Sequence, residues 1–447
     1  MTMYQFSKDL YADVRIEEIY ELWLGVKNGE LDSDGMVRER GAMIRVFDGK
    51  MWYTSTTNKL DEIQKELDNL AALATPNPDI MNHPQVKKLE VHTEEVIRFD
   101  GERDVRNITR AQWKALLDSY IDDCIDKSIT EMGIWFVGTS CSHKKKSFYS
   151  SKGAHIEQDM QECSIAMWCG FTVDGVTTYG GKGYVELEPS KLYGHEEEII
   201  KERDRYLDFA RHAVQAEPGV YTCVLAPCVT AMFAHESFGH KSEADYMLND
   251  KTLQEEWVMG KKVGSEKVFF CDDGSMMNHG YTPYDDEGSK AKKVWLMKDG
   301  VLTGRLHDAK SAMTLEEDLT GNCRAQSYSH FPMVRMTNTY MAAGTDDPEQ
   351  MIKEVKDGIY VYMVQHGSGL ATFTMKPSIC YRIRDGKLCE PLRVNVLTGS
   401  VFETLFEIDA VGTDFEMFNA YTCGKNGQSA PVSAGGPSIR VKKLTVN

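Results

Sequence analysis

The sequence predicts an α+β protein in two halves: a mixed α/β N-terminal half, residues 1–217, and a β-rich C-terminal half, residues 218–447. Three observations predict this class. Amphipathic helices and alternating strand segments share the first half, a Glu-Pro-Gly break follows the last long helix, and short β segments with turn signals fill most of the chain beyond Trp295. A chain of 447 residues is long enough for two large domains, each with its own core.

Two amphipathic helices are predicted before the strand region of the N-terminal half. Residues 60–74 carry apolar side chains at helical spacing, and the Thr75–Asp79 segment, with two prolines, ends this helix in a linker or exposed loop. Residues 108–126 form the second helix. Its core-facing side chains are predicted to be Trp113, Leu116, Leu117, Tyr120 and Cys124.

Two alternating segments follow, at residues 133–151 and 162–181. They are rich in β-branched and aromatic residues and predict successive antiparallel strands. The lysine run Lys144–Lys146 is interpreted as a solvated strand turn, with a basic binding site as the alternative. Residues 196–216 form a further amphipathic helix, which Glu217–Gly219 ends, so we place the domain boundary there.

The C-terminal half opens with a short apolar strand at Tyr221–Pro227. Pro227 suits the first turn of a helix, where its missing N–H costs no hydrogen bond. This helix leads into the histidines described below and is the candidate metal-binding helix. Further along, the sequences KDG, DGK, LTGS and AGGP mark turns between short β segments.

The composition narrows the possible partners and location. A formal net charge of −17 disfavours non-specific nucleic-acid binding, because Lys and Arg are needed to neutralise phosphates, and it disfavours an anionic membrane surface for the same reason. Residues 1–15 do not resemble a secretory signal, and the apolar stretch Val224–Ala234 is too short to span a bilayer. We therefore expect a cytoplasmic protein whose eleven cysteines are reduced and mostly pack in its cores.

A candidate metal site lies in the segment AHESFGH. His235, Glu236 and His240 follow the pattern H-E-x-x-x-H. The histidines are five residues apart, which separates them by about 140° around a regular α-helix. A π-bulge, or a break at Gly239, would bring them to one side. We therefore predict an irregular turn at Ser237–Gly239; the alternative is two histidines on opposite faces of a surface helix.

A catalytic zinc site uses three protein ligands and leaves one position for water. With His235 and His240 as two ligands, spacing alone leaves the third open among several residues. The candidates are Glu243, Asp245, His279, Cys228, Cys271 and Cys423. Glu236 is the candidate general base, because it points away from a ligating His235 yet can reach a zinc-bound water. It would take a proton from that water and deliver it to the leaving amine.

Several longer motifs follow one another in a recognisable order. They are HESFGH followed by EAD, GYTPYDDEG (Gly280–Gly288), TGNCR (Thr320–Arg324), RMTNTY (Arg335–Tyr340) and CGKNGQSAPVSAGGPSI (Cys423–Ile439). On these motifs the C-terminal half resembles the TldD/PmbA family, whose members are often labelled modulators of DNA gyrase. Gly41–Val46 and the order of helices and strands extend the resemblance over essentially the whole chain.

The resemblance implies a zinc metallopeptidase of the TldD-like branch, since the other branch lacks the metal set. It implies one zinc ion per active subunit, held by His235, His240 and Cys423, with Glu236 as the catalytic base. It also implies unfolded or leader-peptide substrates, and a homodimer or a heterodimer with a metal-free paralogue. Extended peptides fit as well, because a strand edge of the β-rich half can hold them by main-chain hydrogen bonds. Ala325 departs from the family pattern, which often has a second arginine there.

The surroundings of Cys423 suit this role, because the glycines of its loop permit close backbone approach and Lys425 would favour the thiolate. The other motifs are given structural interpretations. Asp285, Asp286 and Glu287 form a capped, solvated turn, with a second cation site as the alternative. Arg335 is a partner in a structural ion pair, and Gly435–Pro437 is a turn, with a substrate groove as the alternative. Packing roles are assigned to Cys163, Cys169, Cys380 and Cys389.

Two other functions remain open from the sequence. One is a non-catalytic binding or modulator protein whose metal is structural or absent. For such a protein the negative charge argues against direct DNA contact, so an effect on gyrase would be indirect. The other is a different zinc hydrolase, such as an amidase, which would use the same site chemistry.

Overall fold

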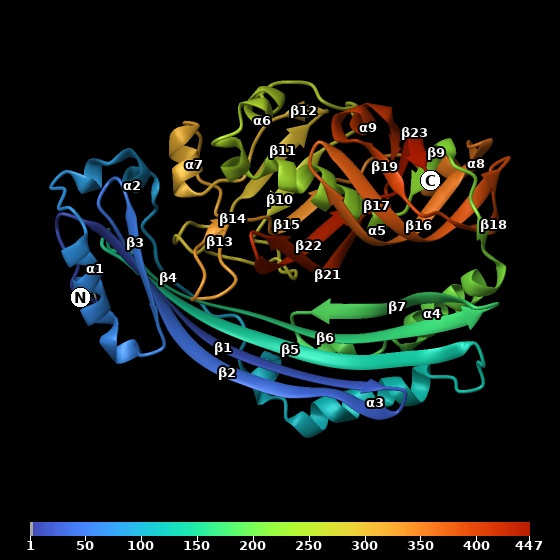
Figure 1. Ribbon diagram of the computed structural model, residues 1–447, viewed down its shortest axis with the longest axis horizontal. Coiled ribbons are helices and arrows are strands. Elements are labelled where there is room, and N and C mark those ends of the chain that lie inside the picture. Colours follow the sequence, from blue (N-terminus) through green and yellow to red (C-terminus); the bar gives the residue numbers. More distant parts are fainter. Residues whose placement is uncertain (1–2) are drawn as a thin grey trace.

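A curved antiparallel sheet underlies the whole molecule in the computed structural model, which describes residues 3–447 (Figure 1). Its strands run in the order β3-β2-β1-β5-β6-β4, and β7 pairs with β6. The strands are β1 (Tyr11–Lys27), β2 (Glu30–Phe47), β3 (Trp52–Thr57), β4 (Thr93–Val96), β5 (Met132–Ser150), β6 (His155–Val173) and β7 (Val176–Glu186). All pairings are antiparallel except that of β4 with β6.

Helices cover the outer face and one end of this sheet (Figure 1). They are α1 (Ile63–Leu73), α2 (Pro84–Lys88), α3 (Arg110–Cys124) and α4 (Glu196–His212), joined by short 3₁₀ turns. The five predicted inward residues of α3 are all buried and pack with Ile165 and Met167 of β6. The three long helices and the strand region therefore confirm the predicted N-terminal elements.

Two predictions for this half need correction. The strands β1, β2 and β3 were not expected, although Asn28 and Gly29, with φ of 50° and 87°, supply the left-handed backbone that a tight hairpin turn requires. The lysine run Lys144–Lys146 is not a turn: it lies within β5, and Lys146 is only 6% exposed. Its charge is tolerated there because carboxylates face it, as described below.

The C-terminal half contains two further sheets (Figure 1). One has the order β12-β11-β10-β15-β22-β21, and the other has the order β16-β9-β23-β19-β17-β18-β8 with β20 beside β23. Their strands are β8 (Val214–Gln215), β9 (Gly219–Leu225), β10 (Phe270–Asp273), β11 (Lys293–Lys298), β12 (Val301–Leu302), β15 (Asn338–Met341), β16 (Asp357–Gly369), β17 (Thr372–Arg384), β18 (Lys387–Arg393), β19 (Leu397–Ser400), β20 (Ile408–Val411), β21 (Glu416–Lys425), β22 (Gln428–Gly436) and β23 (Ile439–Val446). A separate pair consists of β13 (Cys323–Arg324) and β14 (Met333–Val334).

One buried helix joins these two sheets. Helix α5 (Pro227–Phe233) begins at Pro227, as predicted, and contacts β16 on one side and β21 and β22 on the other. Gly435 and Gly436 lie in β22 and not in the predicted turn, and a Cβ on Gly436 would come within 2.6 Å of Thr230 on α5. The shorter helices are α6 (Lys251–Glu256), α7 (Ala309–Thr314), α8 (Pro348–Lys353) and α9 (Val401–Glu407). The mixture of helices and strands confirms the α+β class.

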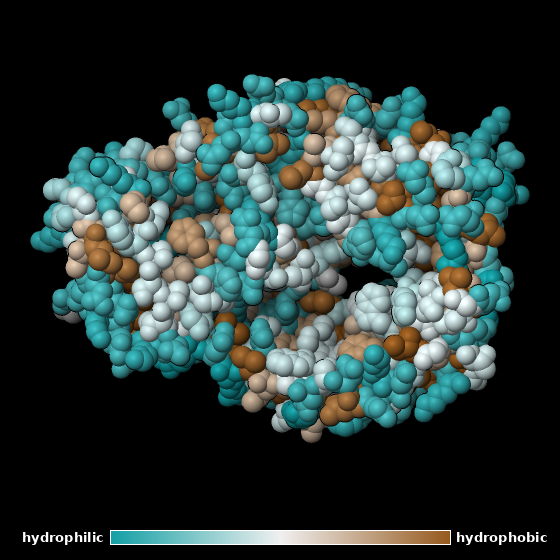
Figure 2. Space-filling view, in the orientation of Figure 1, coloured by the Kyte–Doolittle hydropathy of each residue, from teal (hydrophilic) through white to brown (hydrophobic). Residues whose placement is uncertain are grey.

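The two halves meet across a partly open boundary. Figure 2 shows a largely hydrophilic surface that is hollowed between them. A cavity of about 290 Å³ lies at this boundary, lined by Ser142 and Lys144 from β5 and by Thr422 and Pro431 from the hairpin β21–β22. Among the helices within residues 3–447, none is both long and apolar enough to cross a bilayer.

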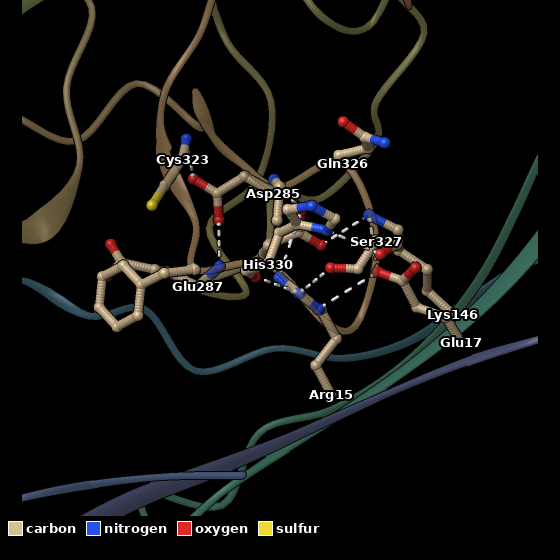
Figure 3. A network of polar contacts seen from close by, with 12 residues as sticks. Arg15, Glu17, Lys146, Asp285, Glu287, Cys323, Gln326, Ser327 and His330 are labelled. Carbon is tan, nitrogen blue, oxygen red and sulfur yellow. Dashed lines mark hydrogen bonds and ion pairs between the residues drawn. The ribbon is translucent and has the colours of Figure 1, made fainter. Parts of the chain in front are cut away.

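Elsewhere the boundary is closed by buried charges. Figure 3 shows Arg15, Glu17 and Lys146 from the N-terminal sheet beside the loop of Asp285 and Glu287. Lys146 Nζ lies 2.6 Å from Asp286 Oδ1, and Arg15 Nη1 lies 3.5 Å from Asp286 Oδ2. The acidic triplet is 2%, 3% and 5% exposed, so its interpretation as a solvated turn is wrong. Its carboxylates join the halves and accept backbone N–H bonds from the Cys323 and Ala325 region.

Candidate metal centre

A π-helical turn places the two histidines on one side of the chain. Helix α5 passes directly into a π turn at Ala234–Gly239, and a 3₁₀ turn follows at His240–Ser242. The His240 backbone N–H donates to the His235 carbonyl, which is the i→i+5 bond of a π turn. The predicted irregular turn is therefore confirmed, and the alternative of histidines on opposite faces of a surface helix is wrong.

Gly239 is required in this turn by close packing. Its φ of −58° is open to any residue. However, an added Cβ would lie 2.1 Å from Met336 Sδ and 3.2 Å from the Ala234 carbonyl oxygen. Met336 is fully buried, so it has little space into which it can move.

His235, His240 and Cys423 come together from two distant parts of the chain. Their ligand atoms all lie within 4.8 Å of one another, and Cys423 Sγ is 3.5 Å from His240 Nε2. The side chain of His235 is 3% exposed and that of Cys423 is 1% exposed. Within residues 3–447, this is the one group of three or more such ligands close enough to hold a metal, so a second cation site at Asp285–Glu287 finds no support.

The electrostatics of the group suit a cation. Burial would raise the pKa of the Cys423 thiol, but the imidazoles of His235 and His240 lower it to about 5. Burial lowers the pKa of His240, but the Cys423 sulfur and the Glu243 carboxylate more than offset this and raise it. The site therefore favours a thiolate, which is the form of cysteine that binds metals. In addition, His235 Nδ1 is buried without a hydrogen-bond partner among the described residues, and a metal bond would satisfy it.

Glu236 lies beside these three residues without joining them. Its Oε2 is 4.0 Å from His240 Nε2, and its side chain is 20% exposed, so the carboxylate is accessible to a small reactant. Burial raises the pKa of Glu236, whereas the charges of His235, His240 and His366 oppose the increase. His366, on β16, is a neighbour of Glu236 that no sequence pattern indicated.

The other third-ligand candidates have different partners. Asp245 pairs with Lys425 at 2.7 Å, and His279 contacts Glu162. The thiol of Cys228 donates to the Tyr362 carbonyl at 3.0 Å, and Cys271 is buried beside Asp272. Glu243 contacts His240 from behind, at Nδ1. Among the candidates weighed from the sequence, Cys423 is the one whose side chain lies within 4.8 Å of ligand atoms of both histidines in the described part of the chain.

Two cationic residues near the site have partners that the sequence did not indicate. The ammonium group of Lys425, which was expected to favour the Cys423 thiolate, pairs with Asp245 and Glu243. Fully buried Arg335 forms no ion pair within the described residues, so that prediction is wrong: its guanidinium donates to the backbone carbonyls of Cys423 and Gln428. Arg335 thereby holds the hairpin that carries Cys423.

The remaining predicted positions have simple packing explanations. Ala325 contributes its backbone, since its N–H donates to Asp286 Oδ2 at 2.7 Å. Cys163, Cys169 and Cys380 are at most 2% exposed and pack in the cores, whereas Cys389 is partly exposed.

Several known proteins are similar to this chain. Residues 218–447 match the PmbA/TldA metallopeptidase C-terminal domain, and residues 12–75 match PmbA/TldA metallopeptidase domain 1. A metalloprotease of Methanocaldococcus jannaschii is 30% identical over 451 residues, which cover 96% of this chain and 95% of the relative. A zinc metalloprotease TldD homolog of Saccharolobus solfataricus is 36% identical over 233 residues, which cover 51% of this chain and 52% of the relative.

The fold also occurs in a solved structure. A Thermotoga maritima protein described as a modulator of a DNA gyrase superposes with a TM-score of 0.76 at 18% sequence identity. The match covers 98% of this chain and 96% of that one, so the two proteins share the arrangement of both halves.

Proposed function

The chain belongs to the PmbA/TldA metallopeptidase family, and from this premise we propose that it is a zinc-dependent peptidase acting on unfolded or extended peptides. The observation that carries the proposal is the convergence of His235, His240 and Cys423, with ligand atoms within 4.8 Å, beside the carboxylate of Glu236. The relative from Saccharolobus solfataricus, itself named a zinc metalloprotease, supports the choice of metal.

The donor set fits one zinc ion per subunit. Two imidazoles, one thiolate and an open position make a known catalytic zinc set. Soft sulfur together with nitrogen favours zinc over calcium or magnesium, which prefer oxygen. A structural zinc site would need a fourth protein ligand, and the group found among the described residues contains three. The alternative of a structural metal is therefore less well supported.

Each residue has a distinct part in the proposed chemistry. His235, His240 and Cys423 would hold the ion, which when bound supplies Lewis-acid activation of water and of the scissile carbonyl. Glu236 would accept the proton that water loses and carry it to the leaving amine. Burial raises the pKa of Glu236, and a higher pKa makes its carboxylate a better proton acceptor.

The strand that carries Cys423 supports the choice of extended peptides. β21 is the last strand in its sheet order, so one of its edges is not paired within that sheet, although β7 lies near its Asn419 end. Pairing along a strand edge selects extended chains with weak sequence preference and excludes folded proteins. Leader peptides are substrates of this kind.

Three further proposals concern the setting of the enzyme. We propose division into domains at Glu217, supported by the family match that begins at residue 218. We propose a dimer with a second copy or with a metal-free paralogue, and no direct contact with nucleic acid. We also propose a cytoplasmic location, supported by eleven cysteines that are all free in the structure.

The proposal is tested by measuring zinc content and peptide cleavage in three proteins. Wild type should bind one zinc per chain and cleave. Glu236→Ala should keep its zinc but lose activity about 10²–10⁴-fold, and Cys423→Ser should lose zinc. Glu349→Ala and Cys389→Ser, at more accessible positions away from the site, are the matched controls and should behave as wild type. Undiminished cleavage in Glu236→Ala would refute the base role.

A further inference from the structure

A buried ion pair lies directly behind the ligand group. Lys425 Nζ is 3.2 Å from Glu243 Oε2, and the two side chains are 1% and 0% exposed. Lys425 also binds Asp245 at 2.7 and 2.8 Å and donates to the Val334 carbonyl at 2.9 Å. The proposed chemistry does not use these charges. An ion pair this deeply buried contributes little net stability, so it calls for another explanation.

One end of the pair fixes the ring of His240. The same oxygen of Glu243 that meets Lys425 lies 3.2 Å from His240 Nδ1. A carboxylate at Nδ1 holds the proton on that nitrogen, which leaves the lone pair of Nε2 free for a ligand. His240 Nε2 accordingly faces Cys423 Sγ, at 3.5 Å.

The other end of the pair belongs to the segment that carries Cys423. Lys425 follows Cys423 by two positions in β21, and residues two apart in a strand point to the same face. Glu243 follows His240 by three positions. The pairs His240–Glu243 and Cys423–Lys425 thus each consist of one ligand and one buried charge, and the two charges meet.

We propose that Glu243 and Lys425 are positioning residues that lock His240 and Cys423 into a preformed metal site. Glu243 orients the imidazole, and Lys425 holds Glu243 while tying β21 to the turn after His240. The inference rests on the proposed function, because it concerns the same site. It explains why charges are kept where apolar residues would pack at least as stably.

The test measures zinc affinity in the full chain by competition with a chromophoric chelator, together with the visible spectrum of the Co²⁺-substituted protein. Glu243→Gln and Lys425→Met should each weaken zinc binding about 10–100-fold and shift the Co²⁺ bands. The double variant should resemble either single variant instead of showing the product of both losses, because the pair acts as one unit. Lys425→Arg, which keeps the positive charge, should bind zinc more tightly than Lys425→Met.

The control breaks a lysine–carboxylate pair nearer the surface in the same half. Lys267→Met removes the partly exposed pair with Asp346 and should leave zinc affinity and the Co²⁺ spectrum unchanged. If Lys425→Met fails to fold, the double variant, which buries no unpaired charge of this pair, provides the measurement.

The outcomes separate the two proposals. Folded variants with wild-type zinc affinity and an unchanged Co²⁺ spectrum would overturn the positioning role and leave the proposed function intact. A wild type that binds no zinc would instead overturn the proposed function. Losses that multiply in the double variant would show two independent packing effects and would also overturn the inference.

Discussion

Replacing Asp286 with asparagine is expected to loosen the joint between the two halves. The Asp286 carboxylate is 3% exposed and faces Lys146 at 2.6 Å and Arg15 at 3.5 Å. Asparagine keeps the shape and an acceptor but removes the charge, so two buried cations lose their closest shared partner. Removing one partner of a buried pair costs about 3–5 kcal/mol. Glu17 remains 3.2 Å from Arg15 and 3.6 Å from Lys146. We therefore expect a cost at the lower end of this range, about 3 kcal/mol.

This free energy converts into a measurable change of melting temperature. Unfolding entropy is about 2.1 cal/mol/K per residue, which gives roughly 0.9 kcal/mol/K for a chain of 447 residues. A loss of about 3 kcal/mol then lowers the melting temperature by about 3 °C if the chain unfolds as one unit, and by about 6 °C if the C-terminal half unfolds alone.

Differential scanning fluorimetry of wild type and Asp286→Asn measures this change. The matched control is Glu349→Gln, which removes the charge of an exposed pair with Lys353 and should cost less than about 1 kcal/mol. A melting temperature of Asp286→Asn within about 1 °C of wild type would refute the reasoning, because it would show that the two buried cations lose little when this partner loses its charge.

Three other predictions follow from the same contacts. Gly239→Ala should destabilise the protein, because overpacking against Met336 costs about 1–3 kcal/mol and outweighs a helix-propensity gain of about 1 kcal/mol; a higher melting temperature would contradict this. Burial raises the pKa of Glu287 from 4.5 to about 7, against the opposing charge of Arg45. Between pH 4.5 and about 7 the folded state therefore holds a proton that the unfolded chain lacks, and stability falls as the pH rises through this interval. Glu287→Gln should reduce the fall. Equal slopes of melting temperature against pH in the variant and the wild type would contradict this prediction. Zinc added at 100 times its dissociation constant to protein stripped of metal should raise the free energy of unfolding by about 2.7 kcal/mol. An equal increase in Cys423→Ser would argue against Cys423 as a ligand.

The helices of the N-terminal half were predictable because their packing repeats along the chain. Each has an apolar stripe that contacts the sheet, so a period near 3.6 is visible in the sequence. The strand β1 was not predictable in this way. Asp13, Arg15 and Glu17 occupy its buried positions, so the usual alternation of apolar and polar residues is lost. Those charges are stable only because partners from β2, β5 and the acidic loop meet them.

The metal site was predictable to the extent that its chemistry is local. The spacing of His235 and His240 required an irregular turn, and helix geometry alone supplied that inference. Cys423 lies 183 residues beyond His240, and no periodicity connects the two. The resemblance to a known family supplied this candidate ligand. Glu243 was misjudged although it is close to His240 in the sequence. Its spacing suggested a metal ligand, and only the fold shows that its carboxylate meets Nδ1 of His240.

The charged residues that sequence reasoning misplaced share one physical property. Lys146, Asp286, Arg335 and Lys425 are each 6% exposed or less. A buried charge must meet an opposite charge or several hydrogen-bond partners, so each of these residues must lie where separate segments of the chain meet. Their sequence context shows only that they are charged, which on average favours the surface. Lys145 and Lys146 show the difficulty: they are neighbours in β5, but the first side chain is 44% exposed and the second residue 6%. Only the fold separates them, because it brings Asp286 to Lys146.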